Sequence, residues 1–431
     1  MIQKIKEVKR VLGELKLPGD KSISHRAVMF SAMAEGISTV KNYLDSEDVN
    51  STIDCFRKLG CNITQTDTEL TIESKGFGGF TKPTSDLDAG NSGTTTRLIS
   101  GILSAQKYDS TIVGDESLSQ RPMKRIVEPL SRMGAKIITS DAGTLPLRIK
   151  ATDGLSPIEY DMQIASAQIK SAILIAGLHL DEETIVVEHS RSRNHTETML
   201  GLKVDEFDGF RKIYSSKKNY PKPTNYIVPS DISTAAFFIV LALVSKNSEL
   251  VLKDVLLNET RIGIIKILKQ MGGKIEIENP KESGGEKLGD LRIFSSNLTN
   301  IEIGEAIIPN IIDEIPILSV AGLFAKGKFI IKNAKELRFK ESDRIAALCS
   351  NYVKLGVDVK EFEDGFEISG NIVNKNVLIE SFNDHRIAMA FSILGMLTNQ
   401  EIDINNFESV AVSNPKFLEQ IDQISSELTL G

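Results

Sequence analysis

Phosphate or carboxylate binding is the chemistry that residues 18–26 suggest. This segment, PGDKSISHR, places Lys21, two serines and Arg26 directly after a Pro-Gly break and ahead of an apolar run. Such a break followed by Ser22 or Ser24 predicts a capped helix start, where free N–H groups and partial positive charge attract anions. A capped helix with two solvated cations explains the same residues, so the segment alone leaves both interpretations open.

Four further segments of the first half carry polar side chains at predicted helix starts. Residues 88–97 (DAGNSGTTTR) combine two glycines with several hydroxyls, and residues 119–125 (SQRPMKR) set three cations around a proline. Ser166 and Gln168 open an apolar helix, and residues 190–195 (SRSRNH) place a serine between arginines. Guanidinium groups bind phosphate through paired hydrogen bonds, and glycines let backbone approach a ligand. Each segment alone also fits a turn, a cap or a solvated face.

The second half of the chain adds acids. Asp313 stands in an apolar run (residues 311–316, IIDEIP), where a carboxylate must be paired or functional because burying an unpaired charge is costly. Residues 338–344 (RFKESDR) interleave cations and acids, although a salt-bridged surface helix start explains them equally well. Asp384 is placed to orient or to charge His385. Cations in one half and acids in the other predict acid–base chemistry in a cleft between two domains.

Length and composition narrow the class of protein. A chain of 431 residues is too long for one ordinary core and predicts two domains. The net charge of −7 leaves no global basic field for nucleic acid, and the three cysteines form no CxxC pair that predicts zinc or a disulfide framework. No signal peptide is expected at the N-terminus, and the longest apolar run is too short to span a bilayer. We expect a cytoplasmic protein with no metal, nucleic-acid or membrane partner.

One pattern recurs along the chain: an amphipathic helix, a Leu-Gly or Met-Gly stop, and a β-branched run. The glycine fits the left-handed position just after a helix, and the β-branched residues fit a strand. A sixth copy is expected to end near residue 424. The pattern predicts six α/β units in two sets of three. The repeated glycines, at intervals of 74, 67, 71 and 84 residues, are Gly60, Gly134, Gly201, Gly272 and Gly356.

The two halves also begin alike. Pro18-Gly19-Asp20 is echoed by Pro229-Ser230-Asp231, and an alanine-rich helix is expected after each. The second copy lacks Lys21 and Arg26, so these two cations are additions to a shared architecture. We place the domain crossings at the two prolines, which predicts a first domain of residues 19–229 and a second of residues 1–18 plus 230–431.

Taken in order, eight motifs resemble those of the 5-enolpyruvylshikimate-3-phosphate synthase (3-phosphoshikimate 1-carboxyvinyltransferase) family over nearly the full length. They are PGDKSISHRA, GNSGTTTR, RPM, ASAQIKSA, SRSRNHTE, DEIP, KESDR and NDHR. The resemblance implies an α/β (α+β) two-domain enolpyruvyl transferase fold of six βαβαββ units in two pseudo-threefold domains. It implies transfer of the enolpyruvyl group of phosphoenolpyruvate to the 5-hydroxyl of shikimate 3-phosphate, with release of phosphate, in aromatic amino-acid biosynthesis. It also implies a monomer without metal or organic cofactor.

The resemblance carries roles onto matching residues. Asp313 would hold the 5-hydroxyl and take its proton, and Glu341 would protonate the methylene carbon. The catalytic set implied is Lys21, Asp313, Glu341 and His385. The phosphoenolpyruvate set is Lys21, Asn91, Gly93, Thr94, Arg121, Gln168, Arg344 and Arg386. The shikimate 3-phosphate set is Lys21, Ser22, Arg26, Ser166, Gln168, Arg193, Asp313 and Lys340.

The chain differs from the family pattern in places, and two alternative interpretations must be weighed against the resemblance. Val412 stands where many members have a lysine, with Lys416 nearby, and Ala167 stands where some members have a second serine. Together with the segment SRSR at residues 190–193, these departures favour a divergent bacterial branch of the family. The UDP-N-acetylglucosamine enolpyruvyl transferases share the fold but use a loop cysteine near residues 115–121, where this chain has none. A non-enzymatic anion-binding protein is a further alternative, against which the acids Asp313 and Glu341 argue.

Overall fold

The computed structural model describes residues 1–66 and 68–425, and the chain divides into two compact units. What we call the first unit comprises Pro18–Pro229 and Glu282–Glu286. The second unit comprises Met1–Leu17, Ser230–Lys281 and Lys287–Gly431. Within each unit, α-helices pack against small sheets, as the α/β pattern of the sequence predicts.

The first unit contains three four-stranded sheets with one shared design. In each, the first two strands in spatial order pair in parallel and the remaining pairs are antiparallel. The sheets are β14-β3-β5-β4 (Asn225–Ile227, Glu35–Lys41, Glu69–Lys75, Asn62–Gln65), β6-β7-β9-β8 (Leu87–Asp88, Ser110–Val113, Leu147–Lys150, Lys136–Ile138) and β10-β11-β13-β12 (Glu159–Met162, Thr184–Glu188, Phe210–Ser215, Val204–Phe207). The helices are α1 (Lys21–Met33), α2 (Glu47–Lys58), α3 (Gly93–Leu103), α4 (Glu116–Ser119), α5 (Lys124–Arg132), α6 (Ala167–Gly177) and α7 (His195–Leu200).

The second unit repeats the design less regularly. Its sheets are β16-β17-β15-β2 (Lys274–Ser283, Glu286–Phe294, Glu249–Leu256, Leu12–Lys16), β18-β20-β19 (Phe329–Ile331, Gly365–Ser369, Asp358–Phe362) and β1-β22-β21 (Gln3–Lys4, Ile402–Asn405, Val377–Glu380). Two of these sheets have three strands, and β1 and β2 come from the N-terminus. The helices are α8 (Ile232–Val244), α9 (Gly263–Gln270), α10 (Ile308–Ile311), α11 (Ile315–Phe324), α12 (Arg344–Lys354), α13 (His385–Met396) and α14 (Phe417–Ile424), with a 3₁₀ turn, η4 (Lys335–Phe339), ahead of α12.

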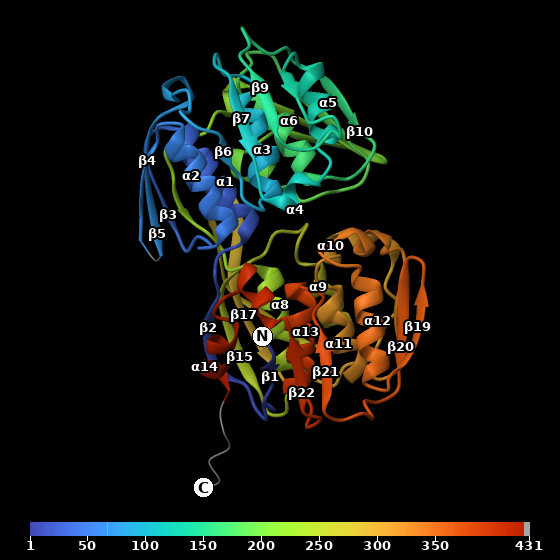
Figure 1. Ribbon diagram of the computed structural model, residues 1–431. Coiled ribbons are helices and arrows are strands. Elements are labelled where there is room, and N and C mark those ends of the chain that lie inside the picture. The colour runs from blue at the N-terminus through green and yellow to red at the C-terminus, as the bar shows by residue number, and fades with distance from the viewer. Residues whose placement is uncertain (67, 426–431) are drawn as a thin grey trace. The chain divides into compact units, whose positions relative to one another are not determined.

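Apolar helices form the centre of the second unit. Helices α8, α11 and α13 pack on one another, and the sheets of this unit surround them (Figure 1). Helix α8 (ISTAAFFIVLALV) buries every residue except its last, as expected for a helix that is apolar on all sides. In the first unit, α3 packs on α6 and on α1 in the same way. Polar residues are therefore left to the ends of these helices.

The length and composition of the helices bear on whether the chain could cross a membrane. Among the helices of the described residues, none is long and apolar enough by itself to span a bilayer. Two stretches, Glu305–Ile311 and Ile315–Phe324, reach the required length and composition only as a pair bent by 114°.

The glycine stops are confirmed at all five predicted positions. Each glycine follows a helix with a positive φ, between 58° and 101°. The next residue donates its backbone N–H to a carbonyl five positions earlier, as Cys61 does to Phe56 at 3.0 Å and Gly273 to Leu268 at 2.8 Å. This is the Schellman arrangement, which turns the chain from helix into strand.

The start of α1 differs from the sequence prediction. Asp20, and not Ser22 or Ser24, caps the helix: its Oδ1 accepts the N–H of Ile23 at 2.9 Å. The Ser24 hydroxyl instead donates to the Asp20 carbonyl at 2.8 Å, inside the first turn. Gly19 brings the chain so close to Asn42 that a Cβ would lie 2.0 Å from its carbonyl oxygen. Because this close approach fixes where the chain turns into the helix, the cap falls on the residue directly after it.

Candidate active site

Three helix starts of the first unit gather the predicted anion-binding residues. Helix α1 begins at Lys21 behind the Asp20 cap, and α3 begins at Gly93 behind a Ser92 cap that accepts from Thr95 N at 3.1 Å. Ser166 caps α6 as predicted, accepting from Ile169 N at 3.5 Å. Each start leaves backbone N–H groups facing outward, where they favour an anion.

Arg121 is fixed against the loop that precedes α3. Its Nη2 donates to Asn91 Oδ1 at 2.6 Å and to Ser117 Oγ at 3.3 Å. Asn91 in turn donates to Asp115 Oδ2 at 2.7 Å. The side chain of Arg121 is therefore oriented before any ligand binds, which reduces the entropy lost when it pairs with an anion.

Arg97 joins this cluster, although it was absent from the sequence-based set. It donates to Gln168 Oε1, while Gln168 Nε2 donates to Thr94 Oγ1 at 3.0 Å. A Cβ on Gly93 would lie 3.2 Å from Arg97 Nη1 and 3.5 Å from Arg121 Nη1. Burial, together with Arg121 and Arg125, lowers the pKa of Arg97, as expected where cations converge. The signal was available in the sequence, because Arg97 lies one helical turn after Gly93.

Lys21 and Arg26 occupy different surroundings. The Lys21 ammonium pairs with Asp48 at a partly exposed position. Arg26 is buried and donates to Thr196 Oγ1 at 2.8 Å, to Ser171 Oγ at 2.8 Å and to the Ser22 carbonyl at 3.0 Å. Burial lowers the pKa of Arg26 to about 10, so it remains charged at neutral pH. Its observed contacts join the first turn of α1 to α6 and α7.

A buried charge network lies beneath the loop that carries Arg193. Lys170, which is fully buried, pairs with Glu188 at 3.2 Å and with Glu197 at 2.7 Å. Glu188 also pairs with Arg211 and accepts the Ser192 N–H at 2.8 Å. Burial raises the pKa of Glu188, but Lys170 and Arg211 outweigh it and lower the pKa. This network, which no local motif indicates, holds the loop beside Arg193.

The acids of the second unit converge on one guanidinium. Arg344, whose side chain is 1% exposed, donates through Nε to Asp384 Oδ2 at 2.8 Å. Its Nη2 donates to Glu341 Oε2 at 2.6 Å and its Nη1 to Asp313 Oδ1 at 3.3 Å. Asp384 also caps α13, so its carboxylate serves Arg344 and the helix, while its negative charge raises the pKa of His385 against the larger effect of burial.

Two more cations border this cluster. Lys340 Nζ lies 3.8 Å from Asp313 Oδ1 and donates to Glu336 at 2.8 Å. Arg386 Nη1 donates to the backbone carbonyl of Asp313 at 3.0 Å. All of the second-unit residues that the sequence predicted for the site, namely Asp313, Lys340, Glu341, Arg344, His385 and Arg386, therefore lie in one neighbourhood.

The ionisation states follow from the charges. Burial raises the pKa of Glu341, but Arg344, His385 and Arg386 outweigh it and lower the pKa, so Glu341 is ionised at neutral pH. Burial lowers the pKa of His385 to about 4, with Arg386 adding to the effect. His385 is then neutral at pH 7. An acid role for Glu341 requires a change that raises its pKa when substrates bind.

Acid is expected to destabilise the protein through its buried histidines. Burial lowers the pKa of His179 to about 3 from the ordinary 6.5, so this ring binds a proton when the chain unfolds. Stability is then fully present above pH 6.5 and is lost as pH falls toward 3, by about 2 kcal/mol at pH 5. Denaturant unfolding should show His179→Gln with a weaker pH dependence between pH 7 and 5. Equal slopes in His179→Gln and in the parent would contradict the prediction.

Comparison with known proteins places the chain in a family. The family model described as EPSP synthase (3-phosphoshikimate 1-carboxyvinyltransferase) matches residues 5–421. A 3-phosphoshikimate 1-carboxyvinyltransferase of Petrotoga mobilis is 47% identical over 419 residues, which are 96% of this chain and 97% of that protein. The EPSP synthase structure from Acinetobacter baumannii superposes with a TM-score of 0.91 at 42% identity, covering 98% of both chains.

A more distant structure defines the broader class. The enolpyruvyl transferase NikO from Streptomyces tendae shares the fold with a TM-score of 0.75 at 13% identity, covering 99% of this chain and 97% of that one. The fold of six α/β units is thus the enolpyruvyl transferase fold. Within that class, the chain belongs to the EPSP synthase (3-phosphoshikimate 1-carboxyvinyltransferase) family.

Proposed function

We propose that the two clusters act together on one pair of substrates. The chain is an enzyme that transfers the enolpyruvyl group of phosphoenolpyruvate to the 5-hydroxyl of shikimate 3-phosphate and releases phosphate, in the shikimate pathway. The observation that carries the assignment of roles is the contact of Arg344 with Glu341 and Asp313. It places an acid and a base on one guanidinium that suits an anionic substrate.

In this proposal, phosphoenolpyruvate binds to Lys21, Arg121, Arg344 and Arg386, beside the loop Asn91–Thr94 and Gln168. Arg97 joins Arg121 there, since both guanidinium groups border Gly93. Negative charge from the ligand competes for Arg344 and raises the pKa of Glu341, which can then hold a proton. His385 beside it is neutral and adds no positive charge that would oppose this rise in pKa.

The reaction then proceeds in two steps. Glu341 protonates the methylene carbon, and the 5-hydroxyl adds to the neighbouring carbon as Asp313 accepts its proton. The tetrahedral adduct then returns a proton from the new methyl group to the Glu341 carboxylate and expels phosphate, which re-forms the enol ether. Lys21 and the arginines stabilise the departing phosphate. Shikimate 3-phosphate is held by Ser22, Ser166, Gln168, Arg193 and Lys340, with Arg26 acting through the Ser22 carbonyl that it binds.

The division of the chain into two domains is part of the same proposal. Residues 19–229 supply most of the anion-binding groups, and residues 1–18 plus 230–431 supply the acids. We propose that the substrates bind in a cleft between these domains and that closure excludes water. The enzyme acts in the cytoplasm as a monomer on small-molecule substrates, without metal, nucleic acid or membrane. Sedimentation of the purified protein tests the monomer, and a decrease in the radius of gyration with both substrates tests closure.

Phosphate release is the direct test of the function. We expect release only when shikimate 3-phosphate and phosphoenolpyruvate are both present. Release with UDP-N-acetylglucosamine in place of shikimate 3-phosphate, or with neither acceptor, would contradict the assignment.

Gly93→Ala should weaken phosphoenolpyruvate binding selectively. The added Cβ would lie 3.2 Å from Arg97 Nη1, so this guanidinium must move by a few tenths of an ångström, and at 3.5 Å it would be in ordinary van der Waals contact with Arg121 Nη1. We expect the KM for phosphoenolpyruvate to rise about 5- to 50-fold, with a smaller change in the KM for shikimate 3-phosphate. Steady-state kinetics with each substrate varied in turn measures both. Gly78→Ala is the control, since a Cβ there meets open space; an equal rise in both KM values for Gly93→Ala would argue against the crowding.

A further inference from the structure

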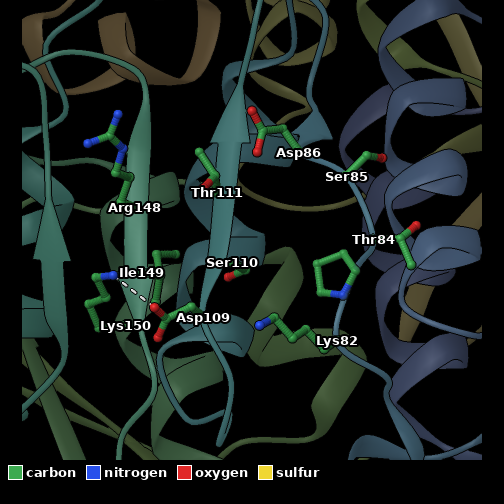
Figure 2. Close-up of a pocket in the computed structure, with 11 residues that line it drawn as sticks. Lys82, Thr84, Ser85, Asp86, Asp109, Ser110, Thr111, Arg148, Ile149 and Lys150 are labelled. Atoms are coloured by element: carbon green, nitrogen blue, oxygen red, sulfur yellow. Dashed lines mark hydrogen bonds and ion pairs between the residues drawn. The ribbon is translucent and has the colours of Figure 1, made fainter.

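A pocket of about 250 Å³ opens beside the sheet β6-β7-β9-β8, and none of the residues assigned to the active site lines it (Figure 2). Its polar side chains do not face one ligand. Ser110 is buried, whereas Arg148 is exposed on the opposite face of the sheet. Asp109 already pairs with Lys150 at 2.8 Å, as Figure 2 shows. A hydrogen-bonded histidine of the same unit points more clearly to a role.

His25 lies on α1, is fully buried, and makes none of the proposed substrate contacts. Its Nδ1 lies 2.7 Å from the Oγ1 of Thr52, a residue of α2. Thr52 Oγ1 lies 2.7 Å from Thr95 Oγ1 in α3, and Thr95 Oγ1 donates to Ser92 Oγ at 2.7 Å. These four side chains form a continuous chain of hydrogen bonds from α1, through α2, to the cap of α3. We call it the His25 relay.

The His25 relay is closed to water. It runs through the interior where α1, α2 and α3 pack on one another, and none of its four residues is more than 1% exposed. Water cannot replace a missing member at such a depth. Removing one member therefore leaves its neighbours with unpaired polar atoms, which is costly in a buried site.

The number of hydrogens fixes the direction of the relay, because each hydroxyl has only one to donate. Thr95 Oγ1 donates to Ser92 Oγ, and its longer contact, with the Asp48 carbonyl at 3.4 Å, also needs it as the donor. Thr52 must then donate to Thr95 across their 2.7 Å contact. Thr52 has no second hydrogen for His25, so it accepts the Nδ1–H of the ring.

The other nitrogen of the ring agrees with this direction. His25 Nε2 is buried and has no hydrogen-bond partner among the described residues. With the hydrogen on Nδ1, Nε2 is an unpaired acceptor, whereas the opposite tautomer would bury an unpaired N–H, which proteins avoid more strictly. Burial, together with Lys21 and Arg26, holds the pKa of His25 well below its ordinary 6.5, so the ring is neutral at pH 7.

The relay ends in the loop that precedes α3. Ser92, its last member, also accepts the Thr95 N–H at 3.1 Å and so caps the helix. Asn91, on one side of Ser92, accepts from Arg121 at 2.6 Å, and Gly93, on the other side, borders the same guanidinium. A change in the position of Ser92 would therefore shift both residues that lie against Arg121.

We propose that His25 is a positioning residue for phosphoenolpyruvate binding, which holds Ser92 and its two neighbours in place through Thr52 and Thr95 without touching the substrate. The inference rests on the proposed function, because it takes this loop as part of the phosphoenolpyruvate site. What the ring supplies is one donor, the Nδ1–H, at a fixed point in the interior.

The position of the ring hydrogen is tested on the full chain without substrates. Isotope labelling with ¹⁵N resolves the ring signals of the five histidines, and the signal that is lost in His25→Asn identifies His25. We expect a neutral ring with its hydrogen on Nδ1. The Thr95 amide, which donates to Ser92 Oγ, should exchange with solvent about tenfold faster in Thr52→Val and at the parent rate in Thr52→Ser.

Steady-state kinetics tests the positioning role. Thr52→Val keeps the shape of the side chain and removes the hydroxyl, so the KM for phosphoenolpyruvate should rise about 3- to 10-fold, with the KM for shikimate 3-phosphate within about twofold. Thr52→Ser restores the hydroxyl and should restore the parent values. His25→Asn, whose amide nitrogen occupies nearly the position of Nδ1, should also stay near the parent, whereas His25→Gln, whose amide reaches the position of Nε2, should resemble Thr52→Val.

Thr184→Val is the matched control. Thr184 is a fully buried threonine of the first unit whose Oγ1 has no partner in the part of the chain that the structure describes, so its loss should leave both KM values unchanged. A ring hydrogen on Nε2, an equal rise in both KM values for Thr52→Val, or a failure of Thr52→Ser to restore them would overturn the proposal. Absence of turnover in the parent protein would contradict the proposed function, and the ring signal and the Thr95 exchange would still test the relay by themselves.

Discussion

The Glu341→Gln enzyme is expected to bind shikimate 3-phosphate as the parent does but to turn over about 100- to 10,000-fold more slowly. Glutamine keeps the length of the side chain and an oxygen that can accept from Arg344, but it cannot deliver a proton. Rapid-quench measurement of phosphate release gives the rate, and calorimetric titration gives the affinity for shikimate 3-phosphate.

A neighbouring glutamate provides the control for this variant. Glu336 lies in η4, is 69% exposed, and pairs with Lys340 at 2.8 Å. Because exposed ion pairs contribute little, Glu336→Gln should stay within about twofold of the parent rate. Unchanged turnover in Glu341→Gln would remove the acid role, and a loss of shikimate 3-phosphate binding would show that Glu341 has a structural role instead.

Arg344→Met should abolish phosphoenolpyruvate turnover and lower the free energy of unfolding by about 3–5 kcal/mol. The variant leaves Asp384 fully buried without its main cationic partner and Glu341 without its ion pair. Replacing arginine by methionine keeps most of the side-chain volume, so the loss of stability reports the missing charge rather than altered packing. Denaturant unfolding measures the stability, and the phosphate-release assay measures the activity.

Two further variants distinguish the effect of leaving a carboxylate buried without its partner from the general effect of losing an arginine. Arg338 also pairs with two carboxylates, Asp343 and Glu361, but all three side chains are partly exposed, so Arg338→Met should cost only about 1 kcal/mol. Adding Asp384→Asn to Arg344→Met keeps a competent N-cap for α13 and removes the stranded charge. The double variant should regain stability but not activity. Equal losses in Arg338→Met and Arg344→Met would contradict this account.

Local rules predicted the repeated parts of the structure well. Gly60 and its four counterparts lie in the left-handed region after their helices, because a glycine stop depends on a few neighbouring residues. The clustering of Asp313 with Glu341 and His385 was expected only from the order of the motifs, and it is seen within the second unit. The prediction that Ser22 or Ser24 caps α1 was wrong, because the close approach of Gly19 to Asn42 is a tertiary contact.

Other features could not be predicted because they join distant residues. Lys170 pairs with Glu188, which also binds Arg211, through the packing of α6 on the sheet β10-β11-β13-β12, and nothing in the residues beside Lys170 specifies that partner.

The pairing of β1 with β22 and of β2 with β15 bears on the order in which the chain can fold during synthesis. Residues 3–4 can pair only after residues 403–404 have been synthesised, and residues 12–16 only after residues 249–253 have been synthesised. The first unit, by contrast, is almost contiguous from Pro18 to Pro229. It can form its core while later residues are still being made, whereas the N-terminal strands remain unpaired until their partners emerge. The ribosome therefore delivers the unit that carries Lys21 and Arg121 before the unit that carries Asp313 and Glu341.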